Sequence, residues 1–427
     1  MKSTPLGALP RPSDQTLDAS RAGGTQMSTQ RAIRAMATVV LILSGAREGR
    51  AMTLTEAMVK VADRLVAKQV KVGVNAGIWP LSVGYTGPIG SGVAAAYMKL
   101  CDGAYGSSAQ LAGDYILFEG HGNYYGDAAY TLTLLSEMSE DPADNVWRTV
   151  LEDFYFNIAH DPGGTPAYVA QYSALDISEA VIYIAHHVIA SHYVNAADAG
   201  LWRQALIDWL AEVDDNTYFP VMAMAAATWA LAETGPMDAT LIDPSGDGAP
   251  YWNLRRLSGL PSLLLSHQAP AGHPYAGSFY ARFDHTNDGG AFAFAAGYTE
   301  DTAFAVLALA ACRAANPVPA LDAAVVAGRN ALFGAIAADG SVWEHISKAG
   351  QVLYVYAGEL LQALAASSPA GDLDVSGRVD FADVALMAGQ YLADGCQLCS
   401  HDNADVNRDG VVNLLDMAVL ADNWLSY

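Results

Sequence analysis

Between residues 52 and 368, apolar residues recur with helical spacing almost throughout, and two kinds of helix alternate. The first kind is apolar on all sides and rich in Ala, Leu, Met and aromatic residues, which is typical of a buried helix. We predict six such helices, over residues 88–101, 125–138, 177–194, 218–233, 302–315 and 354–366. The second kind is amphipathic, so that one side faces water. It is expected over residues 54–68, 107–118, 143–160, 199–212, 320–336 and, with a weaker pattern, 252–267.

Six buried helices alternating with six amphipathic ones predict an all-α fold of the (α/α)6 toroid type, in which an inner barrel of helices is wrapped by an outer one. An open helical solenoid also stacks helix pairs. The unequal helix lengths and long inserts favour the closed toroid. The insert at residues 240–287 is irregular and contains several prolines, and long inserts of this kind are usually functional.

Composition and charge narrow the class of protein. Hydrophobic residues make up 52% of the chain and charged residues 16%, which fits a large buried core. The net charge of −23 argues against a nucleic-acid partner, because phosphates require Lys and Arg. Two cysteines, Cys101 and Cys312, lie in Ala-rich helical stretches and are expected to be buried. Cys396 and Cys399 are expected to form a local disulfide.

The N-terminal region has the pattern of a secretory signal peptide. A basic segment at residues 27–34 precedes an apolar run at 35–43 and small residues at 44–46. The apolar run is too short to span a bilayer. We therefore expect translation to start at Met27 and the mature protein to begin near Arg47 or Met52, secreted or associated with the cell surface. The expected organisation is a leader with signal peptide over 1–51, the toroid over 52–366, a linker over 367–371 and a calcium-binding module over 372–427.

Two acidic loops in that last module have EF-hand spacing. Residues 372–383 and 405–416 place oxygen-bearing side chains at loop positions 1, 3, 5, 9 and 12, and Gly at position 6. A calcium ion requires six to eight oxygen ligands, and the Gly allows the sharp turn that brings them around it. Position 7 contributes a main-chain carbonyl in such loops. We therefore expect two calcium ions as cofactors. The predicted ligands are Asp372, Asp374, Ser376, Arg378, Asp380 and Asp383 in the first loop, and Asp405, Asn407, Asp409, Val411, Asn413 and Asp416 in the second.

The repeat continues beyond the loops, because each is followed by a short amphipathic helix at an offset of 33 residues. With Asp rather than Glu at position 12, residues 371–427 resemble a type I dockerin. The resemblance implies a non-catalytic docking module on a secreted polysaccharide-degrading enzyme, with a cohesin or another cell-surface protein as partner. Dockerins often carry a hydroxyl pair at positions 10 and 11 that contacts the cohesin. Here those positions are Phe381-Ala382 and Leu414-Leu415, which departs from that pattern.

Candidate catalytic residues precede the inner helices, whose N-termini should converge at one end of the barrel. Carboxyl groups there can supply the acid and base of glycoside cleavage, and aromatic rings can stack on sugars. The expected general acid is Glu300 or Asp301, and the expected base is Asp215 or Asp127. The expected substrate-binding residues are Trp79, His121, Tyr125, Tyr218, Arg282 and His285. An acidic residue at a helix start can also be a simple N-cap. The paired His186 and His187 are interpreted as hydrogen-bonded polar residues of the core rather than as metal ligands.

Three functions remain open from the sequence. The first is a secreted glycoside hydrolase acting on a polysaccharide. The second is a polysaccharide lyase, for which the corresponding residues are His121, Asn123, Tyr125, Arg282 and His285. The third is a non-catalytic binding or scaffold protein. The toroid also occurs in terpene cyclases, but residues 212–215 depart from their acidic motif at the first position.

Overall fold

A computed structural model describes residues 52–80, 82–139, 145–285, 294–390, 404, 406 and 411–424. Residues 52–427 form one compact unit. The predicted signal peptide and the Cys396–Cys399 pair lie outside the described residues. No helix among those described is long and apolar enough to cross a membrane.

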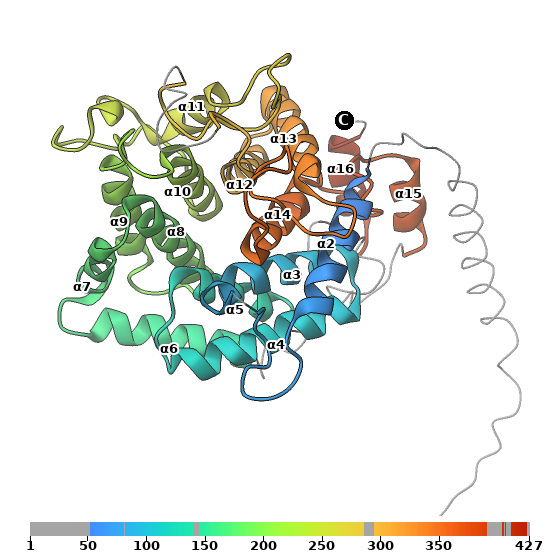
Figure 1. Ribbon diagram of the computed structural model, residues 1–427, viewed down its shortest axis with the longest axis horizontal. Helices are drawn as coiled ribbons and strands as arrows, with labels where there is room; N and C mark the ends of the chain where they lie inside the picture. The colour runs from blue at the N-terminus through green and yellow to red at the C-terminus, as the bar shows by residue number, and fades with distance from the viewer. Residues whose placement is uncertain are drawn as a thin grey trace, which may run out of the picture. The chain divides into compact units, whose positions relative to one another are not determined.

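The six predicted buried helices form a closed ring (Figure 1). Each one packs against the next in the ring, and the last packs back against the first. This closure distinguishes a toroid from an open solenoid, so the predicted (α/α)6 fold is confirmed. The inner helices are α3 (Thr86–Leu100), α5 (Gly126–Glu137), α8 (Ile177–Tyr193), α10 (Pro220–Thr234), α12 (Thr299–Ala315) and α14 (Tyr354–Ser367).

The amphipathic helices pack around this ring, each against inner helices. They are α2 (Leu54–Lys68), α4 (Gly103–Gly120), α6 (Val146–His160), α9 (Ala199–Ala211), α11 (Leu260–Ser266) and α13 (Pro319–Leu332). The weakest predicted helix, 252–267, is shorter than expected. Pro261 confines α11 to a start at Leu260, because proline is tolerated only in the first helical turn. A short helix that was not predicted, α7 (Gly164–Val169), lies between α6 and α8.

Small residues allow the inner helices to approach one another closely. A Cβ atom added to Gly92 of α3 would lie only 2.2 Å from the carbonyl oxygen of Gly358 in α14. The backbones of these two helices are therefore in direct contact where the ring closes. Any larger side chain at Gly92 would force them apart, so this Gly is required by packing rather than by backbone conformation.

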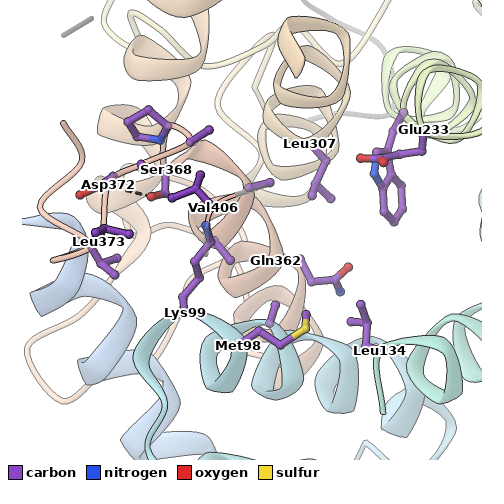
Figure 2. Close-up of a pocket in the computed structure, with 18 of the residues that line it drawn as sticks. Met98, Lys99, Leu134, Glu233, Leu307, Gln362, Ser368, Asp372, Leu373 and Val406 are labelled. Atoms are coloured by element: carbon purple, nitrogen blue, oxygen red, sulfur yellow. Dashed lines mark hydrogen bonds between the residues drawn. The ribbon is translucent and has the colours of Figure 1, made fainter. Parts of the chain in front are cut away.

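The two ends of the ring differ in character. The inner helices begin at one end, where most of the candidate catalytic residues lie. At the other end, a cavity of about 410 Å³ is lined by the C-terminal halves of inner helices and by residues 368–373 (Figure 2).

The C-terminal module has a small core of its own. Its two helices, α15 (Phe381–Ala388) and α16 (Leu414–Asp422), pack on each other. The core residues are Val379, Met387, Ala404, Val412 and Leu420, with Val384, Met417 and Trp424 partly buried against them. Among the described residues, the predicted apolar faces of both helices therefore meet. Tyr391, which follows the first helix in the sequence, lies outside the described residues.

Candidate functional site

Four carboxyl groups from three inner helices lie at the end of the ring where those helices begin. Asp127 is in the first turn of α5, and Glu300 and Asp301 are in the first turn of α12. Glu359 is in the second turn of α14. The carboxyl groups of Glu300 and Glu359 are hydrogen-bonded to each other, and the charges of Asp127 and Asp301 act on Glu359. We refer to these four residues as the carboxyl cluster.

Burial dominates the electrostatics of the cluster. It raises the pKa of Glu300 to about 7, an increase that the hydrogen bond with Glu359 partly offsets. Burial and the neighbouring Glu300 charge raise the pKa of Glu359 well above its ordinary value. A helix N-terminus favours a negative charge by typically 0.3–1 kcal/mol, less than one pKa unit, so burial outweighs it here. At neutral pH the hydrogen-bonded pair therefore retains a proton.

The two aspartates of the cluster differ from each other. Burial raises the pKa of Asp127 to about 6, while the Ala128 N–H, which donates to Oδ1 at 2.8 Å, lowers it. Asp127 is therefore mostly ionised at pH 7. Asp301 is fully buried, and neither of its carboxyl oxygens has a hydrogen-bond partner among the described residues. Burial and the neighbouring Glu300 charge raise the pKa of Asp301 well above its ordinary value, which favours the neutral form. Glu300 alone in the cluster is partly exposed.

Tyrosines surround the cluster. The charge of Asp127 contributes to the raised pKa values of Tyr172 and Tyr183, for which burial is the main cause. The charges of Glu300 and Glu359 likewise contribute to the raised pKa of Tyr356, for which burial is again the main cause. Tyr125 lies over this group, with its ring centroid 5.7 Å from that of Tyr183, and it is 64% exposed. An exposed ring beside buried carboxyl groups is a suitable surface for a sugar.

One of the predicted substrate-binding residues, Trp79, does not lie at any such surface. Trp79 is fully buried and its indole N–H donates to the Leu65 carbonyl oxygen at 2.8 Å, so it belongs to the core and not to a sugar platform. His121 ends α4 with a left-handed backbone, φ 47°, and its ring packs near that of Phe118. Tyr218, in contrast, is 53% exposed immediately before α10.

Asp215 makes a hydrogen bond to the long insert. Its Oδ1 accepts a hydrogen bond from the Phe283 N–H at 2.8 Å, which ties the segment before α10 to the long insert. Near it, the insert forms a chain of hydrogen bonds. The Tyr251 hydroxyl contacts His267 Nε2 at 2.9 Å, and His267 Nδ1 contacts His285 Nε2 at 2.5 Å. Burial lowers the pKa of His267 to about 3, so this imidazole is neutral. Arg282 comes directly before Phe283, whose N–H donates to Asp215.

The paired histidines of α8 are part of the core. His187 lies between the hydroxyls of Tyr155 and Tyr172, each 2.9 Å from a ring nitrogen, and it stacks on Trp202. His186 contacts the Ile182 carbonyl oxygen at 2.9 Å. Burial lowers the pKa of His186 to about 4 and that of His187 to about 3. Both are therefore neutral and hydrogen-bonded.

Sequence reasoning missed Glu359. It is the only charged residue of α14, whose other polar side chains are Gln362, Ser367 and two tyrosines. A single carboxyl group in a largely apolar helix was the available signal, since burial of an acid is costly without a role or a partner. Tyr172 and Tyr183 had no comparable signal, because their position beside Asp127 depends on the packing of α5 against α8.

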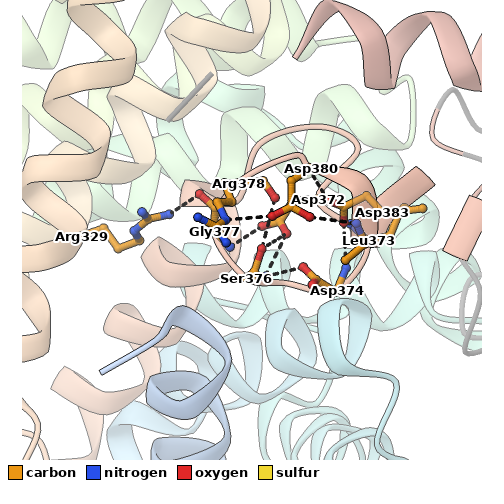
Figure 3. A network of polar contacts seen from close by, with 10 residues as sticks. Arg329, Asp372, Leu373, Asp374, Ser376, Gly377, Arg378, Asp380 and Asp383 are labelled. Carbon is orange, nitrogen blue, oxygen red and sulfur yellow. Dashed lines mark hydrogen bonds and ion pairs between the residues drawn. The ribbon is translucent and has the colours of Figure 1, made fainter. Parts of the chain in front are cut away.

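The first acidic loop has the geometry of a cation site (Figure 3). Oxygen atoms of Asp372, Asp374 and Asp383 all lie within 4.8 Å of one another. The N–H groups of Ser376 and Gly377 donate to Asp372, both at 2.9 Å, and hold its carboxylate in place. These hard oxygen ligands fit calcium. In the second loop Asp405, Asn407 and Asp409 lie outside the described residues, whereas Asn413 and Asp416 form a capping box at the start of α16. Asp380 and Asp383 do the same for α15.

Comparison with known proteins agrees with this reading of the tail. Residues 370–423 match the family model for the dockerin type I domain. No curated protein matches the chain. The structure is similar to the crystal structure of a possible member of the GH105 family from Salmonella enterica serovar Paratyphi A. The sequence identity is 11%, the TM-score is 0.49, and the overlap covers 73% of this chain and 93% of the other. The toroid assignment stands on the closed ring of helices and not on this overlap.

Proposed function

We propose that the toroid is a glycoside hydrolase and that the dockerin domain attaches it to a partner protein. The observation that carries the first part is the hydrogen-bonded Glu300–Glu359 pair beside Asp127. Glycoside hydrolysis requires one carboxylic acid that is protonated and one carboxylate that is ionised. The raised pKa of Glu300 and the lower pKa of Asp127 support such a division near neutral pH.

In the proposed reaction, Glu300 protonates the leaving glycosidic oxygen and Asp127 acts on a water molecule as general base. Glu359 is a positioning residue, which holds the Glu300 carboxyl group by their hydrogen bond and keeps a proton on the pair. Tyr125 and Tyr218, both more than half exposed, are the proposed sugar platforms. Asp215, given its contacts with the insert, is the less suitable of the two candidate bases.

A polysaccharide lyase is the second candidate, because the insert contains a hydrogen-bonded chain of Tyr251, His267 and His285. A neutral imidazole can accept a proton, and a tyrosine whose pKa is raised to about 12 can return one. Arg282 would then face the uronate. In this chain, however, His267 Nδ1 and His285 Nε2 are hydrogen-bonded to each other. These two ring nitrogens are therefore less able to accept a proton from a substrate.

Incubation of the secreted protein with neutral and uronic-acid polysaccharides tests both proposals. New reducing ends without ultraviolet absorbance from an unsaturated uronate support the hydrolase. Absorbance from such a uronate supports the lyase instead. Binding with neither product, across the panel, favours the non-catalytic scaffold and counts against both enzymes.

For the tail, we propose two calcium ions and a protein partner with an apolar contact surface. Phe381 and Leu414 occupy equivalent positions in the two repeats and are 80% and 69% exposed, and Leu415 is 61% exposed. A cohesin surface that binds a hydroxyl pair would be a poor fit for the Phe381 ring and the two Leu side chains. Surface plasmon resonance against a panel of cohesins should detect binding that weakens in Phe381→Ser and Leu414→Ser. Binding that both variants leave unchanged would place the contact elsewhere.

A further inference from the structure

The first acidic loop is packed against the toroid rather than held away from it. The Val375 side chain is only 4% exposed and belongs to the main hydrophobic core of the toroid. The Thr55 hydroxyl at the start of α2 donates to the Val375 carbonyl oxygen at 2.5 Å. Arg329 Nη1, from α13, donates to the Gly377 carbonyl oxygen at 3.3 Å (Figure 3). The loop therefore contacts two outer helices that are far apart in sequence.

The connection between toroid and loop is also fixed. Ser367 ends α14, and the Ser368 hydroxyl donates to Asp372 Oδ2 at 2.8 Å. Arg313 of α12 donates to the Ser368 carbonyl oxygen at 3.3 Å. Residues 368–373 line the cavity at the C-terminal end of the inner ring (Figure 2). The predicted linker thus forms part of the toroid wall and is not a flexible tether.

The loop divides its oxygen atoms between two tasks. The predicted calcium ligands occupy positions 1, 3, 5, 7, 9 and 12. The contacts with α2 and α13 are made by main-chain carbonyl oxygens, those of Val375 and Gly377 at positions 4 and 6 and, at 3.5 Å from the Thr55 hydroxyl, that of Asp374 at position 3. Because these contacts do not use the carboxylate oxygens of Asp374 and Asp383, one loop can hold an ion and contact α2 and α13 at the same time.

The contacts lie at the seam of the ring. Helix α2 is the first of the toroid and α14 is the last, and the two are in contact. The chain ends are where a closed ring of helices can open most readily, since no covalent connection joins its last helix to its first. The loop bridges this seam from α2 to α13, immediately after α14.

We propose that the first calcium loop is a clasp for the toroid, and that calcium binding there stabilises the ring as well as the module. The ion would fix the loop by drawing its carboxylates together, which would hold Val375 and Gly377 in their contacts with α2 and α13. The equivalent positions of the second loop, 408 and 410, lie outside the described residues. This inference rests on the proposed calcium binding but not on the proposed hydrolase activity.

Thermal unfolding of the full-length mature chain, with calcium and with chelator, tests the clasp. Tryptophans buried in the toroid, Trp79, Trp202 and Trp252, report its unfolding by fluorescence. Calcium should raise the Tm of this transition by about 3 °C or more. Asp383→Asn should remove most of that rise. Asp416→Asn is the matched control, since it is equally buried, caps the equivalent helix and has the same loop position. It should keep most of the rise.

Equal loss of the rise in both variants, or a toroid transition that calcium does not move, would overturn the clasp. Calorimetric titration of the same samples with calcium alone separates this result from failure of calcium binding itself. Two bound ions without a shift in the toroid transition would contradict the clasp but leave the calcium sites intact. Absence of bound calcium would remove the premise and with it the clasp.

Hydrogen exchange of the unmutated protein gives a second test that does not depend on variants folding. Calcium should slow amide exchange in residues 54–58 and 326–333, next to the loop contacts. Residues 177–193 of α8, which the loop does not touch, should not change and serve as the internal control. In Thr55→Val, the effect of calcium on residues 54–58 should be reduced. Slowing that is confined to residues 372–424 would rule the clasp out.

Discussion

Glu300 and Glu359 come from adjacent inner helices, α12 and α14, and their carboxyl groups are hydrogen-bonded to each other. Such a contact requires a proton between two groups that would otherwise repel. It places a protonated acid beside a mostly ionised Asp127, within a ring of tyrosines. This pairing, rather than any single residue, supports the assignment of the site.

Neutralising the proposed acid or base should strongly reduce turnover without unfolding the protein. Glu300→Gln and Asp127→Asn should each reduce kcat by about 10²–10⁴-fold, because general acid–base catalysis typically contributes that much. Steady-state rates on the substrate identified from the polysaccharide panel, together with Tm values, provide the measurement.

Asp214→Asn is the control for those variants. Asp214 caps the turn before α10 by accepting hydrogen bonds from the N–H groups of Asn216 at 2.8 Å and Thr217 at 3.1 Å. Asn retains an accepting Oδ1, so this variant should change stability by less than about 1 kcal/mol and leave turnover nearly intact. If Asp214→Asn lowers the rate as much as Glu300→Gln does, the roles have been assigned wrongly.

The rate should depend on pH with a narrow maximum. Asp127 must be ionised, so activity should rise through its pKa of about 6. Glu300 must be protonated, so activity should fall through its pKa of about 7. A pH profile of kcat/KM should therefore peak between about 6 and 7. In Glu300→Gln, the residual rate should lose the alkaline limb, and retention of that limb would assign it to another group.

Burial of Glu300 should make the protein less stable as pH rises. Its pKa is about 7 in the folded state against an ordinary value of 4.5, so between these values the folded state holds a proton that the unfolded state has released. The free energy of unfolding therefore falls through this range, and the full penalty remains above about pH 7. Glu300→Gln should raise the Tm at pH 8 more than at pH 5. A Tm difference that is the same at both values would disagree with a buried, protonated Glu300.

Tyr125 and Trp79, both predicted from the sequence to bind substrate, should respond differently to substitution by Ala. Tyr125→Ala should raise KM and change the Tm little, since the ring is 64% exposed beside the cluster. Trp79→Ala should destabilise the protein by about 3–5 kcal/mol, because it removes a fully buried ring. Denaturant unfolding and Michaelis–Menten kinetics on both variants separate the roles. A large loss of stability in Tyr125→Ala would make it a core residue instead.

The sequence by itself determined the helices, because periodicity and composition are local properties. The all-apolar pattern of residues 218–233 and the amphipathic pattern of 54–68 reappear as α10 and α2. The first acidic loop was equally readable, since three of its predicted ligands, Asp372, Asp374 and Asp383, lie within twelve consecutive residues and have oxygen atoms within 4.8 Å of one another.

Only the tertiary structure decided which distant groups meet. Glu359 contacts Glu300 because α14 packs against α12, and no spacing along the chain encodes that contact. The same is true of Trp79, which is buried in the core and donates a hydrogen bond to Leu65, and of Val375, whose place in the toroid core depends on the docking of the loop. A sequence pattern does not distinguish a buried side chain from an exposed one of the same type. Burial and charge state depend on the neighbours that packing brings together.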